Sequence, residues 1–129
     1  MPLPRPLCDP YVKRVERVVT FTTDQIAAYA QASGDHNPIH RDEDFARSVG
    51  LPGVIAHGML QMGILATVAS EAAGGAGRLR RLYCRFAGMV EPGDTVTFAA
   101  DEAGPGKLAL TALNQRGEPV LTKSIAEYD

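Results

Sequence analysis

Asp35 and His40 are the two side chains of this sequence best suited to move protons. They lie in the run Gly-Asp-His-Asn-Pro-Ile-His, which covers residues 34–40. Pro38 fixes its own φ and disfavours a helical conformation at Asn37, so we predict a shaped loop here and not the interior of a helix. A stiff turn of this kind can direct both side chains at one point. A carboxylate and an imidazole held at one point are the minimum equipment for acid–base catalysis near neutral pH.

The composition indicates one soluble globular domain. The chain has 129 residues, of which 45% are hydrophobic and 22% charged, with a formal net charge of −2. These values suit a single domain with a modest core, and we predict that it spans residues 1–129. Four of the first ten residues are proline, so residues 1–12 are expected to form an extended N-terminal arm. The near-neutral charge and the lack of a basic tail predict no nucleic-acid partner.

The N-terminal and cysteine patterns favour a cytoplasmic location. Prolines stand where a signal peptide would carry an apolar run. The most apolar segment, residues 59–73, is too short and too rich in Gly and Ala to span a bilayer, so no membrane association is expected. Cys8 and Cys84 have no metal-binding spacing. One disulfide between them is conceivable, but we expect both to be reduced, with Cys84 an inert core thiol.

The segments that flank the loop are predicted to be helical. Thr22 and Gln25 have capping-box spacing ahead of an expected helix over residues 23–32, which a glycine ends. A short helix over residues 42–48, capped by Asp42, is expected after the loop. The loop would therefore be held between two capped helices.

The rest of the chain predicts an α+β architecture. Residues 58–73 are expected to form a long helix in which Glu71 is the one formally charged residue, and a helix apolar nearly all round needs burial on most sides. The remaining segments are strand-like, and their short glycine-containing turns indicate antiparallel neighbours. The expected strands cover residues 15–22, 79–90, 94–101, 107–113 and 119–127. Together they predict a curved antiparallel sheet around the helix.

Two of these segments resemble the MaoC-like hydratases and dehydratases, which are hot-dog-fold (R)-specific enoyl-thioester hydratases. The segments are Tyr-Ala-Gln-Ala-Ser-Gly-Asp-His-Asn-Pro-Ile-His at residues 29–40 and Ile-Ala-His-Gly-Met-Leu at residues 55–60. Residues 86–95 are similar to the strand and turn that usually follow in that family. The resemblance covers the chain from about residue 15 to its C-terminus, and Gly-Asp-x-Asn-Pro-x-His is its most specific part.

The resemblance implies a fold, a reaction and a partner. The fold would be a hot dog, in which an antiparallel sheet wraps a long central helix. Asp35 and His40 would be the catalytic pair for reversible hydration of a trans-2-enoyl thioester to an (R)-3-hydroxyacyl thioester. Coenzyme A or the phosphopantetheine of an acyl carrier protein would carry the substrate, without a further cofactor or a metal ion. A homodimer is expected, and a heterodimer with a related hot-dog subunit is the alternative.

The remaining site residues are assigned supporting roles. The backbone N–H of Gly58 is the expected oxyanion donor, because it opens the long helix, where amide protons lack intrahelical partners and the dipole favours negative charge. Asn37 is expected to brace the loop through its backbone, next to Pro38. His57 is expected to brace the turn before the helix. Met59 is expected to lie in the core or to line the acyl tunnel.

Two positions of the motifs carry no expected contact with the reaction. Some family members have a serine on the buried helix near the catalytic carboxylate, where this chain has Ala66. The resemblance then implies that Asp35 is positioned by other groups. His36 fills a variable position of the motif and is expected to face solvent.

Several alternatives stay open at this point. Asp35, His40 and His57 would also suit a metal ion as two histidines and a carboxylate, although a hydratase explains the same residues without one. The chain could instead be the non-catalytic subunit of a heterodimeric dehydratase, or an acyl thioesterase on the same fold. One basic cluster is either a solvated strand edge or a contact for coenzyme A phosphates or an acidic carrier protein. It consists of Arg78, Arg80, Arg81 and Arg85.

Overall fold

The computed structural model describes residues 14–129, so the expected arm over residues 1–12 and Cys8 lie outside the described part of the chain. No helix of residues 14–129 combines the length and the apolarity needed to cross a bilayer. The elements in chain order are β1 (Val15–Thr20), α1 (Thr23–Ser33), the 3-10 turn η1 (Pro38–His40), α2 (Glu43–Ser48), α3 (Gly58–Ala73), the 3-10 turn η2 (Ala76–Arg78), β2 (Leu79–Phe86), β3 (Thr95–Glu102), β4 (Lys107–Asn114) and β5 (Pro119–Tyr128).

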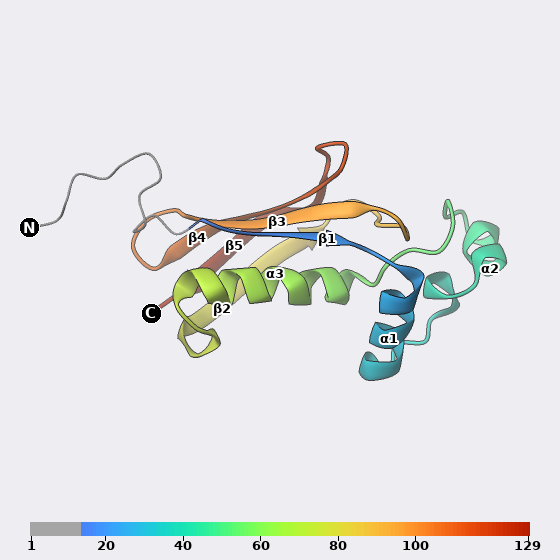
Figure 1. The fold of residues 1–129 in the computed structure, drawn as a ribbon, viewed down its shortest axis with the longest axis horizontal. Coiled ribbons are helices and arrows are strands. Elements are labelled where there is room, and N and C mark those ends of the chain that lie inside the picture. Colours follow the sequence, from blue (N-terminus) through green and yellow to red (C-terminus); the bar gives the residue numbers. More distant parts are fainter. Residues whose placement is uncertain (1–13) are drawn as a thin grey trace, which may run out of the picture.

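The strands form one antiparallel sheet, and α3 runs along one face of it (Figure 1). The strand order is β1-β3-β4-β5-β2, which leaves β1 and β2 at the two edges. In β4 alternate side chains face the helix, and Leu108, Leu110 and Ala112 are buried with Leu65 and Val68 of α3 in one core. The predicted α+β hot-dog fold is therefore confirmed.

Among residues 14–129, only one side of α3 is covered. Its buried residues include Leu65, Val68 and Ala72, all of which face the sheet. The opposite side carries an exposed stripe, which consists of Met59, Gly63, Thr67 and Glu71. The expectation of burial on most sides is wrong for the single chain, because the sheet lies on one side of the helix only. The expectation that Met59 lies in the core is also wrong, since its side chain is 57% exposed.

Two strands are shorter than predicted. β2 ends at Phe86 and not at residue 90, because the amides of Ala87 and Gly88 both donate to the Val120 carbonyl, at 3.0 and 3.1 Å, and the chain then leaves the sheet. β1 ends at Thr20 and not at residue 22, because the side chain of Thr22 caps α1. The other expected helices and strands agree with the described bounds to within one residue at each end.

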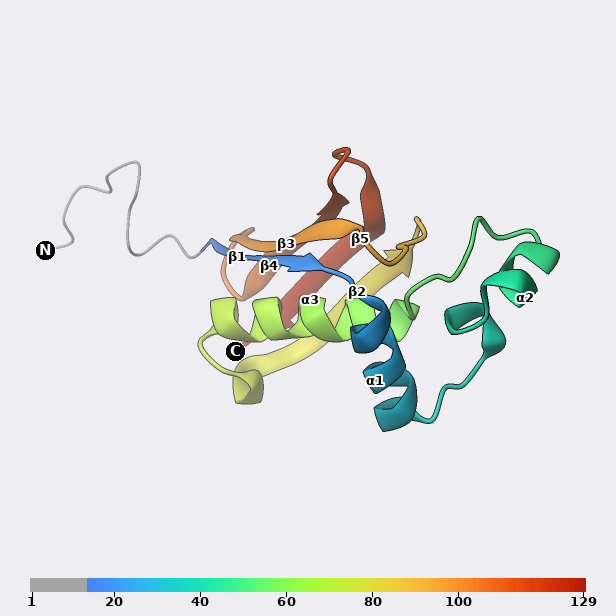
Figure 2. The same ribbon diagram turned by 45° about the vertical axis from the view of Figure 1, so that its right-hand side comes forward.

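Residues 23–50 form an overhanging segment that contains α1, η1 and α2 and lies beyond the N-terminal end of α3 (Figures 1 and 2). Its predicted caps are present. The Thr22 hydroxyl accepts a hydrogen bond from the Gln25 amide at 3.0 Å, and the Asp42 carboxylate accepts one from the Phe45 amide at 3.0 Å. Gly34, at φ +78°, ends α1 in the left-handed conformation that favours glycine. Gly34 and Asp42 thus fix the two ends of the loop that carries Asp35 and His40.

Candidate active site

The loop between α1 and η1 is held by hydrogen bonds between near neighbours. The Asp35 amide donates to the Ser33 hydroxyl at 3.1 Å, and the Asp35 carboxylate accepts from the Asn37 amide at 3.2 Å. The Asn37 side chain accepts from the Ile39 amide at 3.2 Å, and Pro38 opens the 3-10 turn. The brace expected of Asn37 is thus present as an Asx-type turn, which restricts where the two reactive side chains can lie.

Asp35 and His40 face each other across a short gap. His40 Nε2 lies 3.9 Å from Asp35 Oδ2. The histidine side chain is 8% exposed and the aspartate side chain 53%, so one partner belongs to the interior and the other to the surface. His40 Nδ1 lies 2.7 Å from the Ile55 carbonyl oxygen, which can only accept, so Nδ1 carries the proton. In the neutral ring, Nε2 is then the acceptor, and it faces a carboxylate.

His57 contacts both members of this pair. Its ring stacks on His40 with centroids 3.7 Å apart and planes 23° apart, and its Nε2 donates to the Asp35 carbonyl oxygen at 3.1 Å. Tyr29 of α1 approaches the His57 ring at 4.8 Å in an edge arrangement. His57 is 1% exposed, and its burial, aided by the nearby His40, lowers its pKa below 6.5. The ring is therefore neutral at neutral pH.

The arrangement of the two rings disfavours a shared metal ion. Asp35, His40 and His57 can each offer one ligand atom, and these atoms lie within 4.8 Å of one another. A metal ion binds in the plane of an imidazole, along the nitrogen lone pair. Because His40 and His57 are stacked, their lone pairs lie in nearly parallel planes and do not converge on one point. One ring would have to turn before both could bind the same ion.

The N-terminus of α3 opens onto a cavity of about 250 Å³. His57 is the N-cap and makes no side-chain capping bond. Gly58 is the first residue of the helix, so its amide has no intrahelical acceptor. A Cβ atom at Gly58 would lie 3.0 Å from Phe86 Cε1, so the aromatic ring lies directly over this backbone. The cavity is lined by Ile55, Ala56, Gly58, Gln61, Phe86, Ala87, Gly88 and Met89.

Gln61 is a site residue that the sequence analysis missed. It is 3% exposed, it lines the cavity beside Gly58, and its Oε1 has no hydrogen-bond partner among residues 14–129. The sequence feature that could have indicated it is a single amide side chain on the buried, otherwise apolar side of α3. Met59, which was expected to support the substrate, does not line this cavity.

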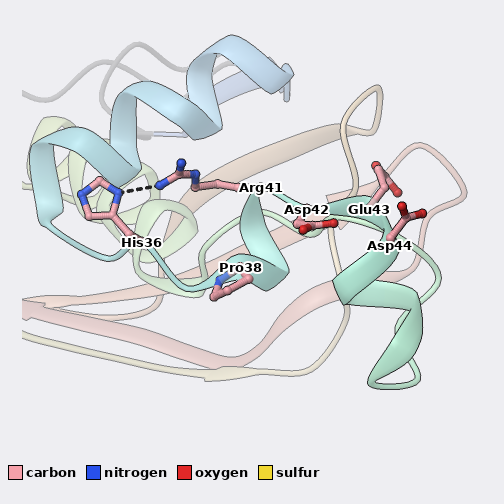
Figure 3. Close-up of a pocket in the computed structure, with 6 residues that line it drawn as sticks. All are labelled: His36, Pro38, Arg41, Asp42, Glu43 and Asp44. Atoms are coloured by element: carbon pink, nitrogen blue, oxygen red, sulfur yellow. Dashed lines mark hydrogen bonds between the residues drawn. The ribbon is translucent and has the colours of Figure 1, made fainter.

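A larger hollow of the described surface lies elsewhere (Figure 3). It measures about 570 Å³ and is bordered by His36, Arg41 and the first turn of α2. The Arg41 guanidinium donates a 3.0 Å hydrogen bond to Nδ1 of the exposed His36 ring, as Figure 3 shows, and the prediction that His36 faces solvent is confirmed. Asp42, which borders the same hollow, caps α2. His40 instead lines a neighbouring cavity of about 350 Å³. The hollow of Figure 3 therefore does not contain the candidate catalytic histidine.

The model of the MaoC like domain matches residues 8–122. The chain belongs to the MaoC-like dehydratase family. Among solved structures, this MaoC-like chain is similar to the (R)-hydratase of A. caviae involved in PHA biosynthesis, with a TM-score of 0.78, 25% identity and coverage of 89% of this chain and 92% of that one. It is also similar to R-hydratase PhaJ1 of Pseudomonas aeruginosa, with a TM-score of 0.77, 26% identity and coverage of 90% and 78%.

The curated relatives of this MaoC-like chain are much longer proteins. It is 32% identical over 106 residues to the peroxisomal hydratase-dehydrogenase-epimerase of Neurospora crassa, which is 82% of this chain and 12% of that protein. It is 45% identical over 73 residues to fatty acid synthase subunit beta of Aspergillus oryzae, which is 55% of this chain and 4% of that protein. The chain thus corresponds to a small part of each, and the family supports hydration or dehydration as its type of reaction.

Most arginines of the basic cluster of this MaoC-like chain pair with Glu127 or Asp129. Arg78 donates to the Asp129 carbonyl, Arg80 pairs with the Asp129 side chain, and Arg81 lies 3.8 Å from Glu127. These exposed pairs favour a solvated strand edge over a phosphate site. Cys84, on the same strand, is half-buried against the core, and burial raises the pKa of its thiol, which suits an inert thiol.

Proposed function

We propose that this chain catalyses the reversible hydration of trans-2-enoyl thioesters to (R)-3-hydroxyacyl thioesters. The observation that carries the proposal is the 3.9 Å gap between His40 Nε2 and Asp35 Oδ2. Both atoms are acceptors when the His40 ring is neutral, so they do not then bond to each other. A water molecule can donate one hydrogen to each of them, and the 3-hydroxyl of the hydrated product can donate its single hydrogen to one of them. The family and the (R)-hydratase neighbours support the same reaction.

The proton balance of the reaction needs no further group. Hydration forms a C–O bond at C3 and a C–H bond at C2, while the C2=C3 double bond is lost. One member of the Asp35–His40 pair takes a proton from the attacking water, and the pair returns a proton to C2 on the same face. Dehydration is the reverse. Both steps are general acid–base catalysis, which typically contributes about 10²–10⁴-fold to a rate.

The start of α3 suits the negative charge that develops on the thioester oxygen. Attack at C3 moves electron density toward the thioester carbonyl as an enolate forms. The Gly58 amide lies at the positive end of a 16-residue helix and beside a cavity, and glycine lets a carbonyl approach closely. One such donor typically lowers a barrier by roughly 3–4 kcal/mol. The proposed oxyanion donor is therefore this amide.

The proposed substrate carrier is coenzyme A or acyl carrier protein, and the proposed assembly is a homodimer. β2 is an edge strand, and Tyr83 and Phe86 on it are 44% and 55% exposed. The exposed stripe of α3 lies on the side that the sheet leaves open. Unpaired strand edges with apolar side chains favour pairing with another chain. Light scattering of the purified chain tests this, and a monomer that is fully active would contradict it.

The proposed reaction is tested by following the enoyl-thioester ultraviolet absorbance. Short, medium and long trans-2-enoyl-CoA substrates are offered to the wild type, to Asp35→Asn and to the matched control Asp24→Asn, whose exposed carboxylate lies in the first turn of α1. We expect the wild type and the control to be equally active and Asp35→Asn to lose at least about 100-fold. Full activity of Asp35→Asn would contradict the mechanism. Release of free thiol without loss of the alkene would show a thioesterase instead.

A further inference from the structure

We infer that His57 is a positioning residue that keeps the reactive groups of Asp35 and His40 at a fixed distance from each other. The inference rests on the proposed function and concerns how its two reactive groups are kept 3.9 Å apart. Asp35 sits on an exposed loop, while His40 is buried, so the gap between them depends on contacts that tie the loop to the core. His57 makes such a contact to each of them.

The first contact anchors Asp35. Its other hydrogen bonds are to Ser33 and Asn37, which belong to the same loop and move with it. Among residues 14–129, the hydrogen bond of His57 Nε2 is the one that joins Asp35 to a residue outside the loop and η1. Ala66 of α3 has no side-chain group that could form a hydrogen bond. The anchoring of the Asp35 backbone, from which the carboxylate extends, therefore depends on His57.

The second contact fixes the ring of His40. The Ile55 carbonyl holds one edge of that ring, at Nδ1, but a single hydrogen bond lets an imidazole rock about the line of the bond. The His57 ring covers one face and removes that freedom. His57 is itself held from the other direction by the edge of Tyr29. The rings of Tyr29, His57 and His40 therefore contact one another in that order, and Nε2 of His40 faces the Asp35 carboxylate.

His57 acts through these two groups and does not exchange protons with the substrate. Its Nε2–H is engaged with a backbone carbonyl, and its Nδ1 is buried without a partner among the described residues. No chain of hydrogen bonds therefore leads through this ring to solvent. Burial also lowers its pKa, which keeps it neutral during turnover. Its function is to fix the gap across which a single water molecule must contact both acceptors.

Three substitutions separate the two contacts. His57→Gln places an amide N–H near the position of Nε2 and removes the ring, His57→Phe keeps a ring and removes the donor, and His57→Leu removes both. We expect kcat to fall about 100-fold in His57→Leu and about tenfold in each of the others, with KM within about threefold, because misplacement of catalytic groups affects the rate more than binding. His36→Phe, the same change at an exposed histidine of the loop, is the control and is expected to stay within about twofold.

A second measurement does not depend on the substrate. Nitrogen NMR of ¹⁵N-histidine-labelled protein reports the tautomer of His40, which we expect to be the Nδ1–H form in the wild type. We expect a mixture in His57→Leu, because a His40 ring without its stacked partner no longer keeps Nδ1 against the Ile55 carbonyl. Wild-type levels of kcat in all three folded variants would overturn the inference and leave the proposed function in place. Equal losses in all three, in proportion to lowered Tm and with the His40 tautomer unchanged, would also overturn it and show a structural role alone. An inactive wild type with the expected NMR change would overturn the proposed function instead.

Discussion

The rings of His40 and His57 lie face to face, 3.7 Å apart, although one belongs to the overhanging segment and the other to the first residue before α3. Two further hydrogen bonds lie at the same junction. The Ile55 carbonyl accepts one from His40 Nδ1, and the Ile39 carbonyl accepts the other from the Ile55 amide. The overhanging segment and the start of α3 therefore meet at this junction through a small number of residues. Substitutions in it are expected to affect the reaction more than the stability of the sheet.

His40→Asn is expected to abolish catalysis without unfolding the protein. The asparagine amide lies near the position of Nδ1 and can still donate to the Ile55 carbonyl, which the native Nδ1 meets at 2.7 Å, but no base replaces Nε2. We expect a loss of kcat of at least about 100-fold with Tm nearly unchanged. His40→Ala removes both groups and should lower Tm as well. Retention of a tenth of the wild-type kcat by His40→Asn would contradict the assignment of Nε2 as a reactive atom.

Gly58→Ala is expected to impair substrate binding at the start of α3. Its Cβ would lie 3.0 Å from Phe86 Cε1 and 3.1 Å from Cδ1, so the ring must shift by a few tenths of an ångström toward the cavity. We expect kcat/KM to fall roughly tenfold and to recover partly when Phe86→Leu is added. Gly63→Ala is the matched control, because no atom lies within 4 Å of its Cβ, and it should stabilise the helix by about 0.5–1 kcal/mol. Equal activity of the two variants would argue against a tight fit at Gly58.

His57 is expected to make the folded state sensitive to acid. Burial lowers its pKa below the ordinary value of 6.5, so just below pH 6.5 the unfolded chain binds a proton that the folded chain does not. This part of the stability is present above pH 6.5 and is lost as the pH falls from there toward the folded-state pKa. The charged and titratable groups near the ring are His40, Asp35, His36 and Tyr29.

Urea unfolding at pH 7.5, 6.5 and 5.5 tests this dependence. The midpoint should fall more steeply below pH 6.5 in the wild type than in His57→Gln, while His36→Gln should follow the wild type. An equal slope in wild type and His57→Gln would mean that His57 is not the group responsible.

The cap of α1 is expected to contribute measurably to stability. The Thr22 hydroxyl accepts a 3.0 Å hydrogen bond from the Gln25 amide, and within the described part of the chain no other side chain caps this end of the helix. Thr22→Ala should lower the free energy of unfolding by about 1 kcal/mol, and Thr22→Ser should leave it nearly unchanged. Denaturant unfolding measures both, and an alanine variant as stable as the serine variant would show that the cap is replaced by water.

Removal of divalent metals is expected to leave the activity unchanged. The lone pairs of His40 and His57 do not converge, so Asp35 and the two rings are not arranged to bind one ion. Dialysis against a chelator, followed by the enoyl-thioester assay and elemental analysis, measures this. Loss of activity that a stoichiometric amount of zinc restores would support the metal alternative.

Most of the fold could be predicted because its signals are local. The caps at Thr22 and Asp42, the glycine that ends α1 and the bounds of α3 all depend on neighbours in the sequence, and all are confirmed. The end of β2 was predicted wrongly, because the strand was extended through Ala87 and Gly88 although both residue types are uncommon in strands. The chain leaves the sheet there because the amides of both residues bond to one carbonyl, that of Val120, on a strand distant in the sequence.

The candidate site was predictable in its residues and not in its geometry. The spacing around Pro38 and the family resemblance indicated that Asp35 and His40 act together, and the structure brings them within 3.9 Å. The stacked position of His57 and the burial of Gln61 depend on how α3 lies relative to the overhanging segment. No pattern in one segment encodes that relationship. Catalysis by these residues, the homodimer and a cytoplasmic location stay predictions.

The short stretch Ile55–Gly58 contributes to both parts of the site. Its first carbonyl orients the base on the overhanging segment, and its residues also line the cavity that Phe86 and its neighbours close from the other side. Under the proposed function, proton transfer and recognition of the acyl group would therefore fall to two separate regions that meet at one strip of backbone. Substitutions at residues 86–89 are then expected to change which acyl group is accepted and to leave the Asp35–His40 pair in place.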